Sequence, residues 1–301
     1  MKFGVFSVSM PEYGIEDSVK LLKEFGYDGV EWRVAEIPDE EPGDVPFEFR
    51  YWKGNKSTLD VKKIAAEAER VKTLCSDAGL EIFGLTTYLD TDQFDELTEV
   101  MKAAQAIGCP RVRVGLVNYD PDKATKTYPE LFEDMRRDLA RISELAGQYG
   151  VKAVVEIHMN TLISSPSAAY RALEGLDPKT VGVIFDPGNM VIEGFEEYRK
   201  SFELLGDFVA HVHIKNSRWI EDGRDDHGAL RWKRDWAPLW EGMADLQRIF
   251  VVMEQLGYDG TVCIEDFSND EPTYDKLSKD LVYIKKLKAA AEQKVREAKE
   301  A

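Results

Sequence analysis

Cysteine is scarce in this chain, and its spacing argues against a fold stabilised by disulfides or zinc. The 301 residues include three cysteines, Cys75, Cys109 and Cys263, and they form no Cys-x-x-Cys pair. An odd number of widely spaced cysteines indicates neither a disulfide framework nor a zinc knuckle. A chain of this length buries roughly three quarters of its unfolded surface, so an apolar core can hold it together.

Positive charge is in deficit, and long apolar runs are missing. The chain has 39 Lys and Arg residues against 56 Asp and Glu residues, a formal net charge of −17. This charge repels the phosphate backbone of nucleic acids and anionic membrane surfaces. No stretch approaches the ~18 apolar residues of a membrane span, and the apolar run in residues 1–11 is too short for a secretory signal. We therefore expect a cytoplasmic protein whose partners include neither nucleic acid nor a membrane.

Short β-branched runs alternate with longer, charged segments of helical pattern along the whole chain. Eight runs are typical of strands: residues 2–8, 29–34, 81–86, 111–116, 152–158, 181–186, 208–215 and 261–266. Apolar side chains recur at helical spacing between them, as in residues 57–78, 93–107, 128–149 and 243–256. Eight strand and helix pairs predict the α/β class and a (β/α)₈ barrel. We expect a single domain over residues 1–301, with an extended C-terminal helix at about 273–301.

A doubly wound parallel sheet is the alternative fold. Such folds of this length usually bind a nucleotide through a glycine-rich loop after the first strand. Neither Gly-x-Gly-x-x-Gly nor Gly-x-x-x-x-Gly-Lys-Ser/Thr follows the first predicted strand here. The missing loop and the count of eight pairs both favour the barrel.

Two connections are longer than a barrel requires, at residues 35–56 and 216–242. They follow the second and seventh strands, which in a barrel places them at the C-terminal mouth, where active sites are built. The second connection holds four of the six tryptophans, Trp219, Trp232, Trp236 and Trp240. We interpret both connections as candidate lids. The alternative is that their aromatic side chains pack the loops onto the barrel rim.

Four successive predicted strands end in a side chain that can bind a metal ion: Glu156, Asp186, His213 and Glu265. The strand alternation places Glu156, His213 and Glu265 on the inward face of the barrel, and Asp186 closes its strand directly before the turn signal Pro187-Gly188-Asn189. Buried acids need a compensating cation. Three carboxylates and one imidazole suit one divalent ion of the manganese, magnesium, cobalt or zinc group. The alternative is that Glu156 and Glu265 form salt bridges with Lys215 or Arg113.

The remaining histidines occupy three different settings. His211 shares the inward face with His213 but lies one layer deeper, which favours a supporting histidine over a direct ligand. His158 lies on the same face as Glu156 and can touch a substrate. His227 lies in the second long connection, where a solvated surface position is expected.

Motifs along nearly the whole chain carry a family resemblance. They lie at residues 27–31, 156–158, 185–189, 211–215, 238–242 and 257–265. The His-x-His-x-Lys and Asp-Pro-Gly-Asn segments are the most specific of them. Together they resemble the sugar phosphate isomerase/epimerase family of xylose-isomerase-like barrels, which is related to the ketose 3-epimerases. The resemblance implies a (β/α)₈ fold and one divalent metal, with the family's four ligands carried over to Glu156, Asp186, His213 and Glu265.

Two positions depart from the ketose 3-epimerases. Those enzymes usually have a histidine three residues after the metal aspartate and an arginine six residues after the metal histidine. This chain has Asn189 at the first position and Trp219, preceded by Arg218, at the second. The long connection before Glu265 suggests a substrate larger than a free hexose, such as a glycoside or keto-glycoside. Some relatives in the family are lyases or deglycosidases on such substrates, and a few of them work beside a second subunit.

The leading hypothesis is a metal-dependent sugar isomerase or epimerase that uses Mn²⁺, with Mg²⁺, Co²⁺ or Zn²⁺ as alternatives. Such an ion polarises a sugar carbonyl and stabilises the enediolate left by proton removal. Glu156 and Glu265 are the candidate bases. If a leaving group lies β to that proton, the same intermediate expels it and the enzyme is a lyase or deglycosidase, with His158 as the extra acid or base. The candidate substrate-binding residues are Asn189, His211, Lys215, Arg218 and Trp219.

Two further classes are weighed against the enzyme. An endonuclease of the same barrel superfamily needs a histidine-rich cluster of several metals and a basic groove, which four histidines and a net charge of −17 disfavour. A binding subunit without catalytic activity is the other alternative. We expect a homo-oligomer acting on a small sugar or glycoside.

Overall fold

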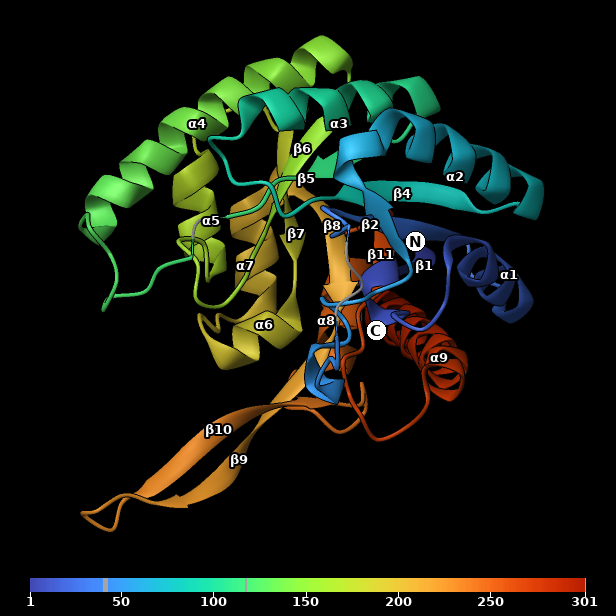
Figure 1. The fold of residues 1–301 in the computed structure, drawn as a ribbon. Helices are drawn as coiled ribbons and strands as arrows, with labels where there is room; N and C mark the ends of the chain where they lie inside the picture. Colours follow the sequence, from blue (N-terminus) through green and yellow to red (C-terminus); the bar gives the residue numbers. More distant parts are fainter. Residues whose placement is uncertain (40–42, 117, 301) are drawn as a thin grey trace.

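The parallel strands of this protein close into a barrel (Figure 1). The computed structural model describes residues 1–39, 43–116 and 118–300. The barrel strands are β1 Lys2–Phe6, β2 Gly29–Ala35, β4 Glu81–Thr86, β5 Arg111–Arg113, β6 Lys152–Glu156, β7 Val181–Phe185, β8 Val209–Ile214 and β11 Thr261–Ile264. Strand β1 closes the ring because it pairs with both β2 and β11; Val5, for example, lies opposite Val30 and Ile264. The predicted (β/α)₈ barrel is confirmed.

Helices surround the barrel on its outer side (Figure 1). They are α1 Ile15–Phe25, α2 Ile64–Ala78, α3 Phe94–Ile107, α4 Tyr128–Tyr149, α5 Pro166–Leu173, α7 Tyr198–Leu205, α8 Leu246–Gln255 and α9 Thr273–Glu300, with the short α6 Pro187–Ile192 directly after β7. Helix α2 ends as the sequence predicts, because Gly79 takes the left-handed conformation with φ 76° and its N–H caps the last turn. In the part of the chain that the structure describes, no helix combines the length and apolar character needed to cross a membrane.

The segment predicted as one helix over residues 57–78 is different in the structure. It begins with a short strand, β3 Thr58–Asp60, which pairs with β2 opposite Arg33–Ala35. A 3₁₀ turn over Val61–Lys63 follows, in which the Asp60 side chain accepts a hydrogen bond from the Lys62 N–H. This cap ends the extended backbone, and the α-helix starts at Ile64.

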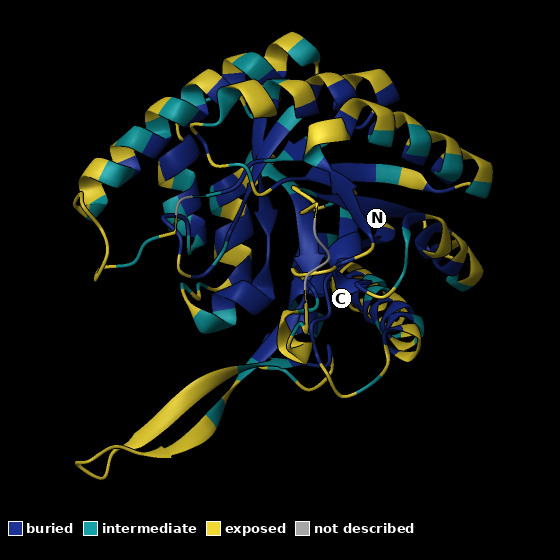
Figure 2. Ribbon diagram, viewed as in Figure 1, coloured by how far each residue is buried: buried dark blue, intermediate teal, exposed yellow. Residues whose placement is uncertain are grey.

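Side chains alternate along the strands as predicted, and the main core lies between the barrel and its helices. On β2, Val30, Trp32 and Val34 join this core, whereas Glu31 and Arg33 belong to the opposite face. Figure 2 shows the barrel strands as buried and the outer helix faces as exposed. A smaller cluster inside the barrel contains Phe6, Val8, Tyr51, Phe83, Cys263 and Phe267. Phe6 of this cluster stacks on the inward-facing His213 with ring centres 5.5 Å apart, so the smaller cluster packs against the polar side chains inside the barrel.

The second long connection forms a β-hairpin. Strands β9 Asn216–Arg224 and β10 Leu230–Ala237 pair in antiparallel register, with Arg234 opposite Trp219 and Trp236 opposite Ser217. The hairpin projects from the body of the molecule, and its outer part is exposed (Figures 1 and 2). The first long connection contains a 3₁₀ turn over Phe47–Phe49; residues 40–42 lie outside the described ranges.

Candidate metal centre

Four buried side chains meet at the C-terminal end of the barrel strands. Glu156 ends β6, Asp186 follows β7, His213 belongs to β8, and Glu265 follows β11. One donor atom from each residue lies within 4.8 Å of the others. The His213 Nδ1 atom is 3.5 Å from Glu156 Oε1, 3.8 Å from Asp186 Oδ2 and 3.6 Å from Glu265 Oε2. The structure thus brings together the four side chains that the sequence places at strand ends.

The chemistry of this cluster fits a divalent cation. The distances from His213 Nδ1 are too long for good hydrogen bonds, and they match the spacing of two donors that each lie about 2.0–2.2 Å from a shared ion. Among the described residues, the buried His213 Nδ1 has no hydrogen-bond partner, and the buried Asp186 Oδ2 makes no hydrogen bond but lies 3.0 Å from the Lys215 ammonium. Buried polar atoms are normally satisfied. An oxygen-rich donor set that includes an unpartnered imidazole nitrogen is what a metal ion would complete.

The Asp-Pro-Gly-Asn segment positions Asp186. Asp186 caps α6, because its Oδ1 accepts a hydrogen bond from the Asn189 N–H at 2.9 Å, and Pro187 takes the first helical position. This bond leaves Oδ2 directed toward the other ligands. Gly188 is required because a Cβ there would come within 2.8 Å of the Lys215 backbone. The local sequence therefore fixes both the direction of the carboxylate and the close contact between α6 and the end of β8.

Two cations neutralise part of the cluster's charge. The Lys215 ammonium is 3.0 Å from Asp186 Oδ2, contacts Glu265 Oε2, and is 3.9 Å from Glu156 Oε1. Arg113 Nη2 is 3.2 Å from Glu156 Oε2. The salt bridges weighed as an alternative therefore exist. Glu31, Glu156 and Glu265 also raise the pKa of His213 well above its usual value against the effect of burial, so this imidazole adds positive charge to the cluster. Burial, with the negative charges of Glu156 and Glu265, raises the pKa of Asp186 to about 7. The raised pKa of Asp186 means that the negative charge of this carboxylate is incompletely compensated, which favours a cation beside it.

Glu31 is a buried carboxylate next to this cluster, and it was not among the site residues predicted from the sequence. Its Oε2 lies 2.8 Å from His213 Nε2 and 3.0 Å from His211 Nε2. Burial alone would raise the pKa of Glu31, but the two imidazoles outweigh it and hold this pKa well below its usual value. The alternation of residues 29–35 already places Glu31 inward, so the signal was present in the sequence. Its two partners could not be found without the three-dimensional pairing of strands.

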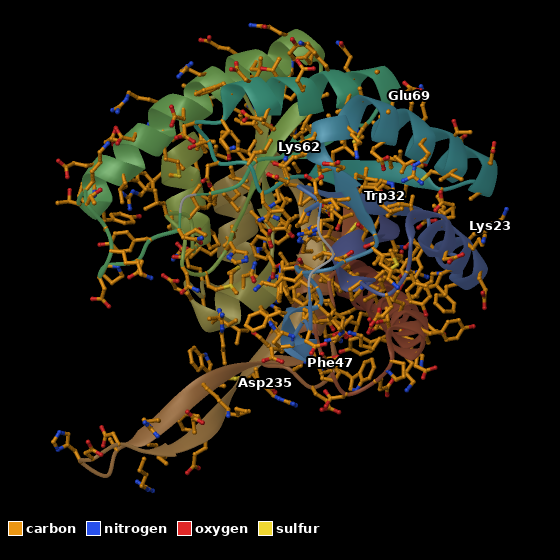
Figure 3. All side chains as sticks on the ribbon, in the orientation of Figure 1. Lys23, Trp32, Phe47, Lys62, Glu69 and Asp235 are labelled. Carbon is orange, nitrogen blue, oxygen red and sulfur yellow. The ribbon has the colours of Figure 1, made fainter. Side chains whose placement is uncertain are left out.

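A cavity of about 610 Å³ lies at the mouth of the barrel, above the cluster. Glu156, Glu265 and Lys215 line it, together with His158. Six aromatic side chains also line it: Phe49, Tyr51, Trp52, Tyr88, Trp236 and Phe267. Figure 3 labels Phe47 and Asp235, which mark the two long connections that contribute to these walls. Both connections predicted as lids thus reach the mouth. Among the described residues of the hairpin, only Arg234 and Trp236 at its base line the cavity.

The predicted substrate-binding residues are divided between the cavity and other places. Lys215 lines the cavity, whereas Asn189 and His211 are buried outside the described lining. Asn189 Nδ2 donates to Glu156 Oε1 at 2.9 Å, so it orients a member of the cluster. Arg218 Nε donates to Asp235 Oδ2 at 2.9 Å on the hairpin, and Trp219 Nε1 donates to the Val191 carbonyl at 3.1 Å. The structure therefore places Arg218 and Trp219 beside the mouth, in contact with other parts of the protein.

His158 lines the cavity with one ring nitrogen already engaged. Its Nδ1 is 2.8 Å from the carbonyl oxygen of Met159. Because a carbonyl oxygen only accepts hydrogen bonds, Nδ1 carries the proton, and Nε2 is the nitrogen left for another group. Burial lowers the pKa of His158, although Glu156 opposes the shift. A neutral imidazole with a free acceptor nitrogen can take up a proton.

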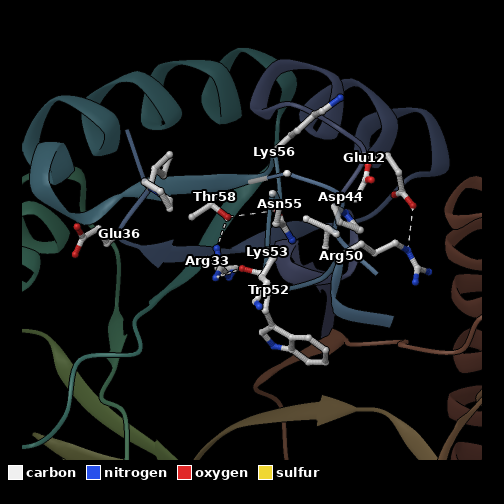
Figure 4. A pocket seen from close by; sticks show the side chains of 16 residues that line it. Glu12, Arg33, Glu36, Asp44, Arg50, Trp52, Lys53, Asn55, Lys56 and Thr58 are labelled. Carbon is white, nitrogen blue, oxygen red and sulfur yellow. Dashed lines mark hydrogen bonds and ion pairs between the residues drawn. The ribbon is translucent and has the colours of Figure 1, made fainter. Parts of the chain in front are cut away.

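A second cavity of about 640 Å³ lies beside the first and contains none of the four clustered side chains (Figure 4). Trp52 lines both cavities. Arg33 fixes this wall, because it donates to the side chain of Thr58 and to the Trp52 carbonyl. The guanidinium groups of Arg33 and Arg113 lie 5.1 Å and 5.2 Å from the centre of the Tyr88 ring. We interpret these contacts as support for the wall of the first cavity.

Known proteins resemble this chain in part of the sequence and in the whole fold. An inosose dehydratase of Lacticaseibacillus casei is 27% identical over 139 residues, which are 44% of this chain and 46% of that enzyme. The chain thus matches about half the length of this relative. A structure of 3-keto-D-glucoside 4-epimerase from E. coli superimposes with a TM-score of 0.68 and 18% identity, covering 95% of this chain and 99% of the epimerase.

A magnesium complex extends these similarities to a metal-bound protein. A xylose isomerase-like TIM barrel protein from Mycobacterium smegmatis, solved with magnesium, superimposes with a TM-score of 0.67 and 17% identity, covering 97% of each chain. At this identity the likeness concerns the fold. The model of one family, the xylose isomerase-like TIM barrel, matches residues 19–287 of this chain. This chain is therefore a member of the xylose isomerase-like TIM barrel family.

Proposed function

We propose that this protein is a divalent-metal-dependent sugar isomerase or epimerase that moves a proton next to a sugar carbonyl. The observation that carries the proposal is the convergence of Glu156, Asp186, His213 and Glu265 below a cavity of about 610 Å³. These four residues would hold the ion. When bound, a divalent cation there would polarise a carbonyl oxygen and stabilise negative charge on it.

Glu156 and Glu265 are the carboxylates assigned to proton transfer. Both line the cavity, whereas Asp186 and His213 lie below the described lining. Burial raises the pKa of Glu156, but Arg113, His213 and Lys215 outweigh burial and hold it well below its usual value. Lys215 and His213 likewise lower the pKa of Glu265 against the effect of burial. Both groups are therefore ionised at neutral pH and able to accept a proton.

The two carboxylates reach the cavity from strands that are not neighbours. Glu156 ends β6 and Glu265 follows β11, with β7 and β8 between these strands in the sheet. If one carboxylate removes the proton and the other returns it to the same carbon, that carbon is inverted. If a single carboxylate returns the proton to the adjacent carbon, the sugar is isomerised. Lys215, which also lines the cavity, is the residue we assign to hold a substrate oxygen.

A metal-dependent lyase or deglycosidase is the second candidate, and the shape of the mouth favours it. Trp236, Arg234 and Trp232 alternate along β10 and share one face of the hairpin. The first two line the cavity, and Trp232, 55% exposed, continues the face outward. An aglycone that extends beyond the sugar could contact this face. His158 would then supply the acid or base for the leaving group.

The test uses the Mn²⁺-loaded protein in D₂O with a panel of ketoses and, separately, with 3-keto-glucosides. An isomerase or epimerase incorporates deuterium next to the carbonyl and yields an epimer or isomer, detected by NMR. A lyase or deglycosidase releases the aglycone. Glu156→Gln and Glu265→Gln should abolish either reaction, whereas Glu241→Gln on the surface should not. If the loaded protein neither exchanges deuterium nor converts any member of either panel, the proposed function is wrong.

Trp232 separates the two candidates further. In a deglycosidase, Trp232→Ala should raise KM for a keto-glucoside with a large aromatic aglycone and leave KM for the methyl glycoside unchanged. Trp240→Ala is the matched control, because Trp240 is similarly exposed at 40% but packs on Tyr283 away from the cavity. If Trp232→Ala and Trp240→Ala have the same KM for the keto-glucoside with the aromatic aglycone, the hairpin does not bind the aglycone and no longer supports a deglycosidase.

A further inference from the structure

Glu31 lies directly behind the candidate metal ligand His213. It is 2% exposed on the inward face of β2, and in the described part of the chain it does not line the cavity. Its Oε2 lies 2.8 Å from His213 Nε2 and 3.0 Å from His211 Nε2, and its Oε1 accepts a hydrogen bond from the Thr86 hydroxyl. Two imidazoles therefore meet at a single carboxylate oxygen.

The proton positions on His211 follow from its other neighbour. Arg111 Nη1 lies 2.9 Å from His211 Nδ1. A guanidinium can only donate, so Nδ1 must accept, and a neutral His211 carries its proton on Nε2. That Nε2–H donates to Glu31. Thr261, whose Oγ1 is 2.7 Å from the same Nδ1, completes the surroundings of the ring. Arg111 thus donates a hydrogen bond to His211, and His211 donates one to Glu31.

The same reasoning fixes His213. The Glu31 carboxylate accepts hydrogen bonds, so His213 Nε2 carries a proton, and Nδ1 keeps its lone pair when the ring is neutral. Nδ1 faces Glu156, Asp186 and Glu265 at 3.5 to 3.8 Å. A metal-binding histidine commonly donates its second N–H to a carboxylate, which fixes its tautomer and ring orientation and raises its basicity.

We propose that Glu31 is the positioning residue of the metal centre, holding His213 with Nδ1 toward the ion, and that His211 and Arg111 hold Glu31 in turn. The inference rests on the metal site of the proposed function. It also assigns a role to a second group of buried donors, Glu31, His211 and Cys263, which are close enough together to suggest another ion. The nitrogen of His211 nearest this group carries a proton, so the group supports the first site and does not bind a second ion.

The test measures metal binding and not turnover. Isothermal titration of the metal-free protein with Mn²⁺ should give one ion per chain, and Glu31→Gln should weaken its affinity by about 10–100-fold. The visible spectrum of bound Co²⁺ should change in Glu31→Gln, because it reports the ligand geometry that a purely structural residue would leave intact. Thr86→Val, which removes the bond to the other oxygen of Glu31, is the matched control and should cost less affinity.

Three outcomes would overturn the inference. One is a Glu31→Gln protein that is folded, by circular dichroism, and binds Mn²⁺ as tightly as the wild type with an unchanged Co²⁺ spectrum. Another is wild-type binding of two ions with loss of one in Cys263→Ala. If Glu31→Gln does not fold, Glu31→Asp and Arg111→Met take its place, and unchanged affinity in both overturns the inference. Failure of the wild type to bind any divalent ion would instead contradict the proposed function.

Discussion

The Lys215 ammonium lies 3.0 Å from Oδ2 of Asp186, a carboxylate with no solvent exposure. Lys215 is itself buried and shared with Glu265 and, at longer range, Glu156. Removing one partner of a buried ion pair leaves an uncompensated charge and typically costs about 3–5 kcal/mol. Lys215 is therefore central to the stability of the site when no metal is bound.

We expect Lys215→Met to lower the free energy of unfolding of the metal-free protein by about 3–5 kcal/mol. Excess Mn²⁺ should restore part of this loss, because the ion would replace the missing positive charge. Urea denaturation in EDTA and in Mn²⁺ measures both effects. Lys279→Met is the control; its ion pair with Glu271 is on the surface and should be worth no more than about 1 kcal/mol. Equal losses in the two variants would contradict the assigned role of Lys215.

Metal binding should depend on His213 and not on a surface histidine. His213→Gln should weaken Mn²⁺ binding at least 100-fold, or about 2.8 kcal/mol, because it removes one of four donors. His227→Gln should bind as the wild type does, since His227 is exposed near the tip of the hairpin. Calorimetric titration provides the affinities. Tight binding by His213→Gln would show that the ion sits elsewhere.

Gly188→Ala should disturb the metal centre without touching a ligand. The added Cβ would come within 2.8 Å of the Lys215 backbone and would push α6 away from the end of β8. Asp186, which caps α6, would move with it. We expect a loss of about 1–3 kcal/mol in the free energy of unfolding and weaker Mn²⁺ binding. Gly14→Ala, where a Cβ meets no atom within 4 Å, should leave Mn²⁺ affinity unchanged.

Asp280 should make the protein less stable as the pH rises. It is fully buried in α9, and neither of its carboxylate oxygens has a hydrogen-bond partner among the described residues. Burial, together with the charge of Asp266, raises its pKa well above the usual value. The folded state therefore holds a proton that the unfolded state releases, and the contribution to stability falls as the pH rises above the unfolded-state pKa.

Asp280→Asn tests this pH dependence. The Tm of the variant should exceed that of the wild type at pH 8, and the difference in Tm should be smaller at pH 5. Asp226→Asn on the exposed hairpin should show no such difference. A Tm difference for Asp280→Asn that is the same at both pH values would contradict the assignment of a protonated Asp280.

Much of the fold was predictable because side chains alternate between two faces along each barrel strand, and this alternation is visible in the sequence. The helix predicted at residues 128–149 coincides with α4, and β4 coincides with residues 81–86. The hairpin was predicted as a loop, because its exposed strands alternate charged and aromatic residues with no apolar face to mark them. Residues 57–78 were predicted as one helix, since pairing of Thr58–Asp60 with β2 depends on a distant segment.

The candidate site was predictable only in part for the same reason. Strand ends meet at one edge of a barrel, so the grouping of Glu156, Asp186, His213 and Glu265 follows from local pattern and topology. Contacts between side chains of strands far apart in the sequence do not follow from local pattern. For this reason the contact of Glu31 with His211 and His213 was not predicted. Arg218 and Trp219 lie three and four residues after Lys215, but the hairpin turns their side chains toward Asp235 and Val191. The roles of the site residues and the oligomeric state stay predictions.

Closure of the barrel by β1 depends on β11, a strand that lies far away in the sequence. Lys2–Phe6 cannot complete its hydrogen bonds until Thr261–Ile264 has left the ribosome. Domains generally fold as units during synthesis, and contacts between distant segments slow folding. While the residues between these two strands are being synthesised, the nascent chain therefore carries an unfinished sheet with two open edges, and we expect its need for chaperones to grow with the length of that interval.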